Sequence, residues 1–331
     1  MRGRRVQIVI PAHAGRRSGN RVTAVRWRRV LEGLGHRVTV QTGWTDERCD
    51  LLVALHAHRS AGSALKFRQR HPSGKLVVAL SGTDLYRDLQ RYQAGHDALA
   101  VADRIVVLQK HGLTRLEPGL RSRCRVIHQS VVVPSRLPSK AVRTWQVAVV
   151  GHLRPVKDPF VTARAARGLP CGSRIRVVHL GAALSDTMKE RAEAESRKNP
   201  KRYRWLGNQP HWKVMRQLAR SRVMVLSSRM EGGANVVGES ISVGTPVVAT
   251  RISGSIGLLG EDYPGFFEPG DVPGLQRLLV ESEKEGDFYQ GLVKQCDQLR
   301  PVFSPKAESA AWKQLLAELF PPGSVERELS A

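Results

Sequence analysis

The sequence predicts an α/β protein made of two domains, each with a parallel β-sheet covered by helices. Two observations favour this fold class. Short β-branched runs alternate with longer amphipathic stretches along the chain, which is the pattern of parallel sheets with helical crossovers. The chain also has 331 residues, more than one hydrophobic core usually supports. We therefore expect two domains of about 150 residues each.

The first predicted domain begins with a strand at residues 6–10, followed by a glycine-containing turn and a helix. Apolar residues recur at helical spacing in that helix until Gly35, at positions Val22, Val25, Val30, Leu31 and Leu34. Further strands are predicted at residues 38–40, 51–55, 76–80, 105–108 and 126–127. This alternation is typical of a Rossmann-like domain.

A second alternating set follows residues 133–140, which carry two prolines and two serines and which we interpret as the linker. We expect an N-terminal domain at residues 1–138 and a C-terminal domain at residues 139–331. The strands predicted in the second domain are residues 147–150, 175–180, 203–206, 223–226 and 246–249, and a terminal helix is predicted at about residues 305–320. Two such domains would place a cleft between the carboxyl ends of their sheets.

The formal net charge of +24 is concentrated in the first part of the chain, where residues 1–140 hold 26 Lys and Arg against 9 Asp and Glu. This excess indicates nucleic acid, an anionic membrane surface, a small phosphorylated ligand, or simply a solvated arginine-rich surface. We do not expect nucleic acid, because the arginines are scattered without interleaved aromatic residues. Membrane contact is not expected either.

The remaining composition favours a cytoplasmic enzyme without structural metal or disulfides. The sequence contains no run of about 18 apolar residues, and its first residues lead into a strand without a signal-peptide pattern. The four cysteines are far apart and form no Cys-x-x-Cys pair.

Two polar segments follow strands of the predicted C-terminal domain. The first, GHLRPVKDP, places Gly151, Arg154 and Lys157 beside the start of a helix. Two cations at a helix N-terminus suit a diphosphate, although this segment alone would also suit an ordinary basic turn.

The second segment, RMEGGANVVGES, carries two carboxylates eight residues apart, Glu231 and Glu239. Gly232 and Gly233 allow a close approach to a ligand, and Asn235 is expected to cap the next helix. Carboxylates beside an anion site suit the hydroxyls of a sugar and a ribose. For Glu239, an ordinary glutamate on a helix surface is the alternative.

These segments, together with VGTPVVAT at residues 243–250, resemble the donor-domain motifs of family-4-type glycosyltransferases. The resemblance implies the GT-B fold, in which two Rossmann-like parallel-sheet domains face each other across a cleft. It implies that Arg154 and Lys157 hold a diphosphate, that Glu231 binds the donor sugar and that Glu239 binds the ribose. Arg154, Lys157 and Glu231 are the expected catalytic residues. The remaining expected donor contacts in this domain are Gly151, Arg229, Gly232, Gly233, Asn235 and Val236.

No metal and no other cofactor are expected. The chain lacks an Asp-x-Asp motif, the usual metal anchor of the other major glycosyltransferase fold. Arg154, Lys157 and the helix dipole would therefore stabilise the departing nucleoside diphosphate.

The N-terminal domain is expected to bind the acceptor, because polar residues follow three of its predicted strands. Gly19, Asn20 and Thr23 match the loop that faces the donor in this fold and are expected to bind the donor, with simple helix capping as an equal alternative. Arg16 and Arg17 add cations beside that loop. The expected acceptor-binding residues are Arg21, His56, His58, Arg59, Thr83, Asp84 and Arg87.

Longer strings, among them SGNRVTAVRW, VALSGTDLYRDL and GLLGEDYPGFF, resemble the bacterial selenosugar synthases (SenB-type) of selenoneine biosynthesis. That resemblance implies transfer of GlcNAc or Glc from a UDP-sugar to selenophosphate, giving a 1-selenosugar, UDP and phosphate. Many relatives place a His-Asp pair after the fourth strand, where this chain reads Thr83 and Asp84. Selenium is already a soft nucleophile and needs cations more than a base.

Two other functions remain open on the sequence. The first is a conventional UDP-sugar-dependent glycosyltransferase that acts on a hydroxyl, for example of an anionic lipid. The second is a non-catalytic nucleic-acid-binding protein, whose binding would depend strongly on salt and would be unaffected by UDP-sugars.

Overall fold

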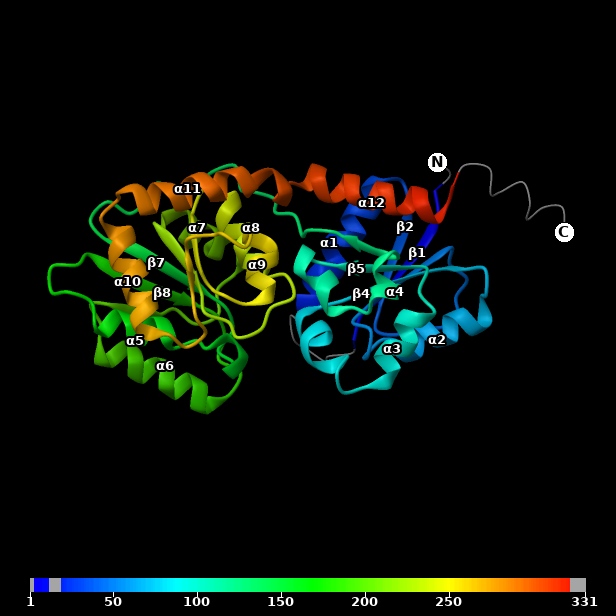
Figure 1. The fold of residues 1–331 in the computed structure, drawn as a ribbon, viewed down its shortest axis with the longest axis horizontal. Helices are drawn as coiled ribbons and strands as arrows, with labels where there is room; N and C mark the ends of the chain where they lie inside the picture. Colours follow the sequence, from blue (N-terminus) through cyan, green and yellow to red (C-terminus); the bar gives the residue numbers. More distant parts are fainter. Residues whose placement is uncertain (1–2, 12–18, 322–331) are drawn as a thin grey trace. The chain divides into compact units, whose positions relative to one another are not determined.

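The computed structural model describes residues 3–11 and 19–321, which fall into two compact units (Figure 1). Unit 1 combines residues 1–130 with residues 305–331, and unit 2 is residues 131–304. Each unit contains a six-stranded, all-parallel sheet with helices on both faces. The two-domain α/β fold predicted from the sequence is confirmed.

Unit 1 has the strand order β2-β1-β3-β4-β5-β6. The central strands are continuous apolar runs because both faces of a parallel sheet are buried; all five residues of β3, for example, are buried. The strands are β1 (Arg5–Val9), β2 (Arg37–Gln41), β3 (Leu51–Leu55), β4 (Lys75–Ala79), β5 (Arg104–Val107) and β6 (Cys124–Val126).

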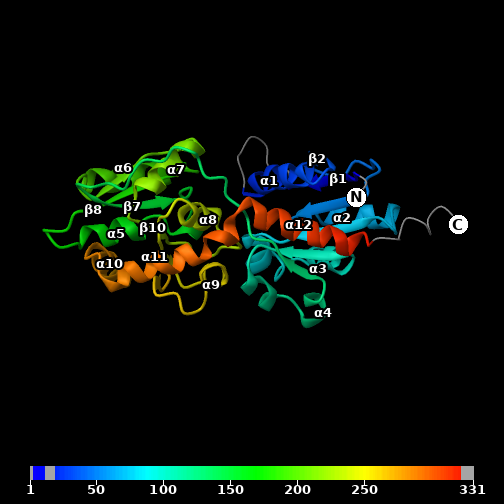
Figure 2. The same cartoon turned by 90° about the horizontal axis from the view of Figure 1, so that it is seen from above.

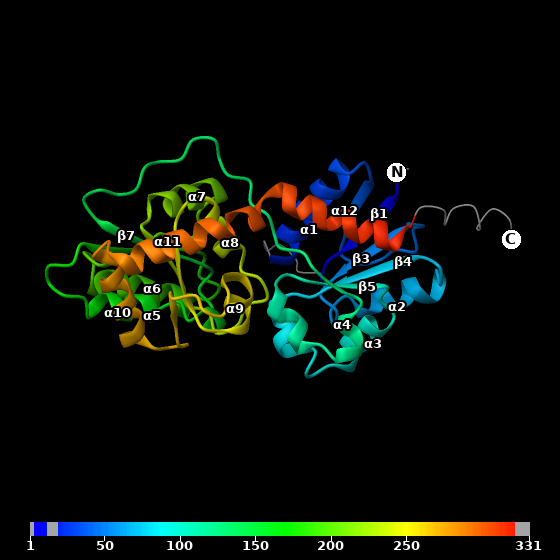
Figure 3. The ribbon, with the colours of Figure 1, turned by 45° about the horizontal axis from the view of Figure 1, so that its top comes forward.

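Helices cover the two faces of this sheet in pairs (Figure 3). Helices α1 (Gly19–Gly33) and α12 (Pro305–Leu319) share one apolar core with the strands, whereas α2 (Ala61–Arg70) and α3 (Gln93–Ala100) share the other. Shorter elements complete the unit: a π-helical turn at Asp84–Asp88, a 3-10 turn at Lys110–Arg115 and α4 (Pro118–Arg121).

Helix α1 buries a different face from the one its aliphatic residues suggest. Thr23, Ala24, Trp27 and Leu31 are buried, whereas Val22 and Val25 are 47% and 39% exposed. The indole of Trp27 buries far more area than a valine, so it sets the rotation of the helix against the sheet. The periodicity predicted the helix correctly and its inner face only in part.

Helix α12 packs in unit 1, although the sequence had placed it in a domain of residues 139–331. The Trp312 ring meets the Trp27 ring edge-on, with centroids 4.9 Å apart. Glu308 accepts hydrogen bonds from Trp27 Nε1 at 2.9 Å and from the Ser130 amide at 3.1 Å, and it also bonds the Ser130 hydroxyl. The chain therefore returns to its first sheet to complete that core.

Unit 2 has the strand order β12-β11-β10-β7-β8-β9. Its strands are β7 (Trp145–Val150), β8 (Ile175–Leu180), β9 (Tyr203–Trp205), β10 (Val223–Leu226), β11 (Val247–Thr250) and β12 (Phe266–Phe267). The two-residue strand β12 was not predicted, because two aromatic residues alone give no strand periodicity. A segment without helix or strand joins β6 to β7 and contains the predicted linker.

The helices of unit 2 also lie in two layers (Figures 1 and 2). One layer holds α5 (Val161–Arg167), α6 (Asp186–Lys198) and α10 (Val272–Glu283), and the other holds α7 (His211–Arg220), α8 (Asn235–Ser242) and α11 (Asp287–Leu299). The short helix α9 (Ser253–Leu259) follows β11. No helix within the described part of the chain is long and apolar enough to cross a bilayer.

The buried carboxylate of α12 gives the first prediction. Glu308→Ala leaves the Trp27 N–H and the Ser130 donors without a partner in a buried site, so we expect a loss of about 2 to 4 kcal/mol of unfolding free energy. Urea unfolding followed by tryptophan fluorescence measures it. Glu318→Ala on the same helix is the control, because its bonds to Arg104 and Arg125 are partly exposed and should contribute about 1 kcal/mol or less. Equal losses in both variants would contradict this account.

Candidate functional site

The basic turn and the glutamate loop of unit 2 lie side by side, because β7 and β10 are neighbouring parallel strands. Both loops follow the carboxyl ends of their strands. The Ser227 hydroxyl donates to the carbonyls of Lys157 and Asp158, at 2.9 and 3.1 Å. The Arg229 amide donates to the Val156 carbonyl at 2.8 Å. These hydrogen bonds hold the loop after β10 against the basic turn after β7.

Lys157 and Glu231 form an ion pair across these two loops. The Ser228 hydroxyl also donates to Oε1 of Glu231, at 2.6 Å. The Glu231 side chain is 11% exposed, so its charge needs the partners it has. The sequence predicted the lysine and the glutamate but missed Ser228, which no motif distinguishes from other serines.

Arg229 and Arg154 differ in their surroundings. Arg229 pairs with Asp158 at 2.9 Å, and Asp158 has a left-handed backbone with φ of 39°. Arg229 therefore braces the basic turn, whose 3-10 segment is Pro155–Lys157. Arg154 precedes that segment and is exposed. Their predicted roles as donor contacts stay predictions.

Gly151, at the end of β7, is supported by a neutral buried histidine. Burial lowers the pKa of His179 to about 4, so the ring is neutral near pH 7. Its Nε2 lies 3.3 Å from the Gly151 carbonyl and its Nδ1 lies 2.8 Å from the Tyr203 hydroxyl. The carbonyl can only accept, so Nε2 carries the proton and the tyrosine donates to Nδ1.

Helix α8 begins without the expected side-chain cap. The sequence analysis assigned the cap to Asn235, but Ala234 is the N-cap residue and Asn235 is the first helical residue. That expectation was wrong by one residue. Alanine has no side-chain acceptor, so no N-cap side chain bonds the amides of the first turn. Gly232 and Val236 are buried, and Gly233 is half-buried.

Glu239 lies on the second turn of α8 and contacts helix α7. His211 Nε2 is 2.9 Å from Glu239 Oε1, whereas Oε2 has no protein partner within the described residues. One carboxylate oxygen is therefore held and the other is open. The sequence gave no signal for His211, because the two residues are 28 positions apart and belong to no shared motif.

Two glycines outside the predicted motifs leave room for the backbone at Glu231 and at Gly151. A Cβ on Gly254 would lie 2.0 Å from the Glu231 carbonyl oxygen. Gly181 has φ of 157°, and a Cβ there would lie 1.9 Å from the Gly151 carbonyl oxygen. Only glycine fits such approaches of backbone to backbone.

In unit 1, His56 and Asp84 form a buried pair at the ends of β3 and β4. His56 Nδ1 is 3.1 Å from Asp84 Oδ1, and Nε2 is 3.4 Å from Asp88 Oδ2. His56 is 1% exposed and has φ of 78°, a strained conformation for a non-glycine residue. The sequence reads Thr83 and Asp84 where relatives carry His and Asp, yet folding supplies the histidine from another loop.

Asp84 also organises the backbone of the loop after β3. Its Oδ2 accepts the Ala57 amide at 2.7 Å and its Oδ1 accepts the His58 amide at 3.4 Å. The side chain is fully buried, so Asp84 acts on this loop and is not available to a ligand in this structure. Its assignment to acceptor binding is therefore at most indirect.

Asp88 is ionised more readily than an ordinary aspartate. Burial opposes its charge, but the hydrogen bond from Arg87 Nε at 2.7 Å and the charges of Arg87, His56 and Arg59 outweigh burial and lower the pKa of Asp88. Arg87 is thereby held through Nε, and 41% of its side chain is exposed.

The other predicted acceptor-binding and donor-binding residues of unit 1 occupy varied positions. His58 stacks on Tyr92 with ring centroids 4.0 Å apart, Arg59 is exposed, and Thr83 precedes the π-helical turn without a side-chain cap bond. Thr23 is buried and donates to the Gly19 carbonyl at 3.1 Å. Gly19 and Asn20 begin α1. Arg16 and Arg17 lie outside the described residues.

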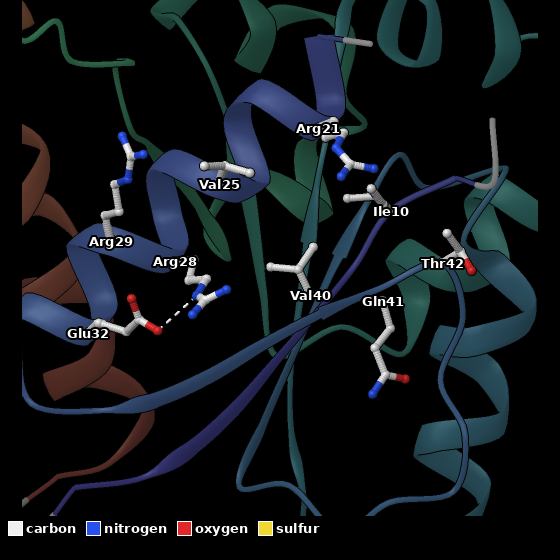
Figure 4. A pocket seen from close by; sticks show the side chains of 9 residues that line it. All are labelled: Ile10, Arg21, Val25, Arg28, Arg29, Glu32, Val40, Gln41 and Thr42. Carbon is white, nitrogen blue, oxygen red and sulfur yellow. Dashed lines mark hydrogen bonds and ion pairs between the residues drawn. The ribbon is translucent and has the colours of Figure 1, made fainter. Parts of the chain in front are cut away.

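A pocket of about 480 Å³ lies beside α1 (Figure 4). Arg21, Val25 and Arg28 project from the helix toward it, and Arg28 pairs with Glu32 at 2.8 Å. Apolar and polar residues at the ends of the first two strands and directly after them close the other side: Ile10, Val40, Gln41 and Thr42. Arg21 thus lines a cavity with both apolar and cationic walls.

Residues 138–291 match the family model described as Glycosyl transferases group 1. The matched residues lie within unit 2. The match covers β7 to β11 and both loops of the site. No curated protein matches the chain at a significant level.

Three solved structures resemble the whole chain. Sucrose-phosphate synthase from Thermosynechococcus elongatus has a TM-score of 0.76 at 15% identity, covering 96% of this chain and 99% of its own. A glycosyltransferase from Rickettsia africae has a TM-score of 0.75 at 13% identity, with 97% and 100% covered. HepE from Anabaena, solved with UDP, has a TM-score of 0.74 at 13% identity, with 95% and 100% covered. These likenesses establish the GT-B fold.

The approach of Gly254 to Glu231 gives the second prediction. Gly254→Ala forces the Glu231 backbone to move, so we expect a loss of about 1 to 3 kcal/mol of stability. Gly291→Ala, also within a helix, is the matched control. No atom lies near a Cβ built there, so that variant should gain up to about 1 kcal/mol. Thermal unfolding of both variants checks the pair, and a fully stable Gly254→Ala protein would contradict the geometry.

The third prediction concerns acid stability. Because the folded-state pKa of Asp88 is lowered, its carboxylate stabilises unit 1 above about pH 4, and this contribution is lost as the pH falls through the lowered pKa. Between about pH 7 and about pH 3, the unchanged protein should lose more unfolding free energy than Asp88→Asn. Asp97→Asn, at a surface hydrogen bond to Gln93, should follow the unchanged protein. Parallel curves for all three proteins would refute the assignment.

Proposed function

We propose that this glycosyltransferase transfers a sugar from a UDP-sugar to the selenium of selenophosphate, giving a 1-selenosugar, UDP and phosphate. The observation that carries the donor half is the assembly of a basic turn, Glu231 and the start of α8 at the carboxyl ends of β7 and β10. HepE, which shares the fold, has been solved with UDP-glucose. The acceptor half rests on the sequence resemblance to selenosugar synthases and on the cations of unit 1.

Lys157 and Arg154 would neutralise the departing UDP. Lys157 already lies against Glu231, so a bound diphosphate would share or take over its ammonium group. Glu231 would then turn from an ion-pair partner into an acceptor for sugar hydroxyls, with Ser228 keeping its carboxylate oriented. A preorganised charge of this kind contributes roughly a hundredfold in rate. The proposal includes no metal.

The open oxygen of Glu239 would accept the ribose hydroxyls. Its other oxygen is held by His211 at 2.9 Å, which fixes the direction of the carboxylate before a ligand arrives. A preoriented acceptor loses less conformational freedom on binding. This arrangement favours a ribose role for Glu239 over that of an ordinary surface glutamate.

The chemistry balances as follows. The selenium forms a bond to the anomeric carbon, and the bond from that carbon to the UDP oxygen breaks. Loss of the phosphoryl group from selenium then consumes one water and releases phosphate. No step removes a proton from the nucleophile before attack. The burial of His56 between two carboxylates suits such an acceptor, because this histidine is no accessible base in the structure.

Cations at the ends of β3 and β4 support an anionic acceptor. Arg59 is exposed, and Arg87 is held through Nε with 41% of its side chain exposed. Guanidinium groups bind phosphate oxygens in pairs of hydrogen bonds. The loop that carries Arg59 is held in turn by Asp84.

A second function is favoured by the pocket beside α1: transfer to a hydroxyl of an anionic lipid. Its walls combine Arg21 and Arg28 with Ile10, Val25 and Val40 (Figure 4). Val22 is exposed on the same helix. Basic residues next to exposed aliphatic ones suit a negatively charged, partly apolar surface.

The decisive experiment supplies purified protein with UDP-N-acetylglucosamine and enzymatically made selenophosphate. Mass spectrometry should find the selenium isotope pattern on a hexosamine, together with UDP. Release of UDP only with a hydroxyl acceptor, or sedimentation with anionic vesicles followed by lipid glycosylation, would refute the selenophosphate proposal and favour the second function.

The fourth prediction separates the two substrates. Glu239→Ala should raise the KM for the UDP-sugar about tenfold or more with little effect on that for selenophosphate, and Arg59→Ala should do the reverse. Glu193→Ala and Arg197→Ala, which break an exposed pair on α6, are matched controls and should leave both values unchanged. Equal effects of Glu239→Ala and Arg59→Ala on both substrates would undo this division of roles.

A further inference from the structure

Trp212 is an exposed indole at the start of helix α7. It is 57% exposed, whereas the five other tryptophans of the chain are buried or half-buried. The exposed side chain is costly to leave in water, because an indole carries one of the largest apolar surfaces of any residue. An amphipathic helix does not need it there, since Val214, Met215, Leu218 and Ala219 already form the buried face of α7.

The position of Trp212 follows from its neighbour. His211, the first residue of α7, reaches Glu239 on α8 at 2.9 Å. The N-terminal part of α7 therefore lies beside the second turn of α8. Trp212 is the next residue, with its Cα about 3.8 Å from that of His211.

The helical repeat places Trp212 at the edge of the buried face of α7. Ala219 is buried and lies seven residues after Trp212, which is close to two full turns. Trp212 thus shares the side of Ala219 and does not point directly away from the domain. Lys213 lies alongside, with its Nζ 5.5 Å from the centroid of the indole ring.

We propose that Trp212 is the stacking surface for the nucleobase of the sugar nucleotide. The inference rests on the proposed function, in which Glu239 binds the ribose. The base is bonded directly to that ribose, so it must lie within one nucleoside length of the Glu239 carboxylate. Trp212 offers a large aromatic surface there, next to the residue that holds this carboxylate.

Stacking of this kind distinguishes a nucleoside diphosphate from bare pyrophosphate. Every base has an aromatic face, so Trp212 contributes affinity for the nucleoside part, and the choice among bases falls to hydrogen bonds from other groups. Loss of a base–aromatic stack weakens binding about 5- to 150-fold. Trp212 is thus an affinity determinant for the donor and takes no part in bond breaking.

The test uses UDP and inorganic pyrophosphate as probes of the full-length protein. UDP should quench the fluorescence of the exposed Trp212, whereas pyrophosphate should not. Calorimetry should show that Trp212→Ala weakens UDP about 5- to 150-fold and leaves pyrophosphate unchanged. Trp212→Phe keeps an aromatic ring and should recover most of the affinity.

The control is Val142→Ala, which removes an exposed apolar side chain of the same unit, 79% exposed. It should bind UDP as the unchanged protein does. Unaltered UDP binding by a folded Trp212→Ala protein would overturn the stacking role and leave the proposed function intact. If the wild-type protein does not bind UDP at all, both the stacking role and the proposed function are overturned. Equal weakening of UDP and pyrophosphate would also refute stacking, because it would place the effect at the phosphates.

Discussion

The ion pair between Lys157 and Glu231 is the interaction on which the candidate site of unit 2 depends. Its partners are 74 residues apart, and only the adjacency of β7 and β10 brings them together. Both side chains are largely withdrawn from water, so each charge stabilises the other. The surrounding backbone is adapted to this pair: Ser227 and Arg229 tie the two loops, and Gly254 leaves room for Glu231. A ligand with phosphate and hydroxyl groups could replace the pair by satisfying both partners.

Unit 1 handles charge differently. Its buried carboxylates, Asp84 and Asp88, are matched by His56, by backbone amides and by Arg87. The cluster stabilises a loop with a strained histidine, and strain of this kind persists only when its surroundings determine it strongly. The charges of Arg59 and Arg87 lie close enough to this cluster to favour the ionised form of Asp88.

The assignment of helix α12 to unit 1 also depends on how a buried polar group is satisfied. Helix α12 returns to unit 1 because Trp27 needs both an apolar neighbour and a hydrogen-bond acceptor, and α12 supplies them as Trp312 and Glu308. Residues that follow the second domain in sequence thus complete the first. Two serine hydroxyls, Ser130 and Ser228, have a similar role in orienting buried carboxylates.

The sequence by itself determined the two parallel-sheet domains, because apolar strand runs and helical spacing are local patterns. It also predicted Arg154, Lys157, Glu231 and Glu239 as ligand-binding residues from short motifs, and these roles stay predictions. Only the tertiary structure decided which side chains meet. The contacts of His211 with Glu239 and of His56 with Asp84 join residues with no shared motif, and the inner face of α1 depends on how one indole packs. Such contacts arise from the packing of separate elements, which no local pattern encodes.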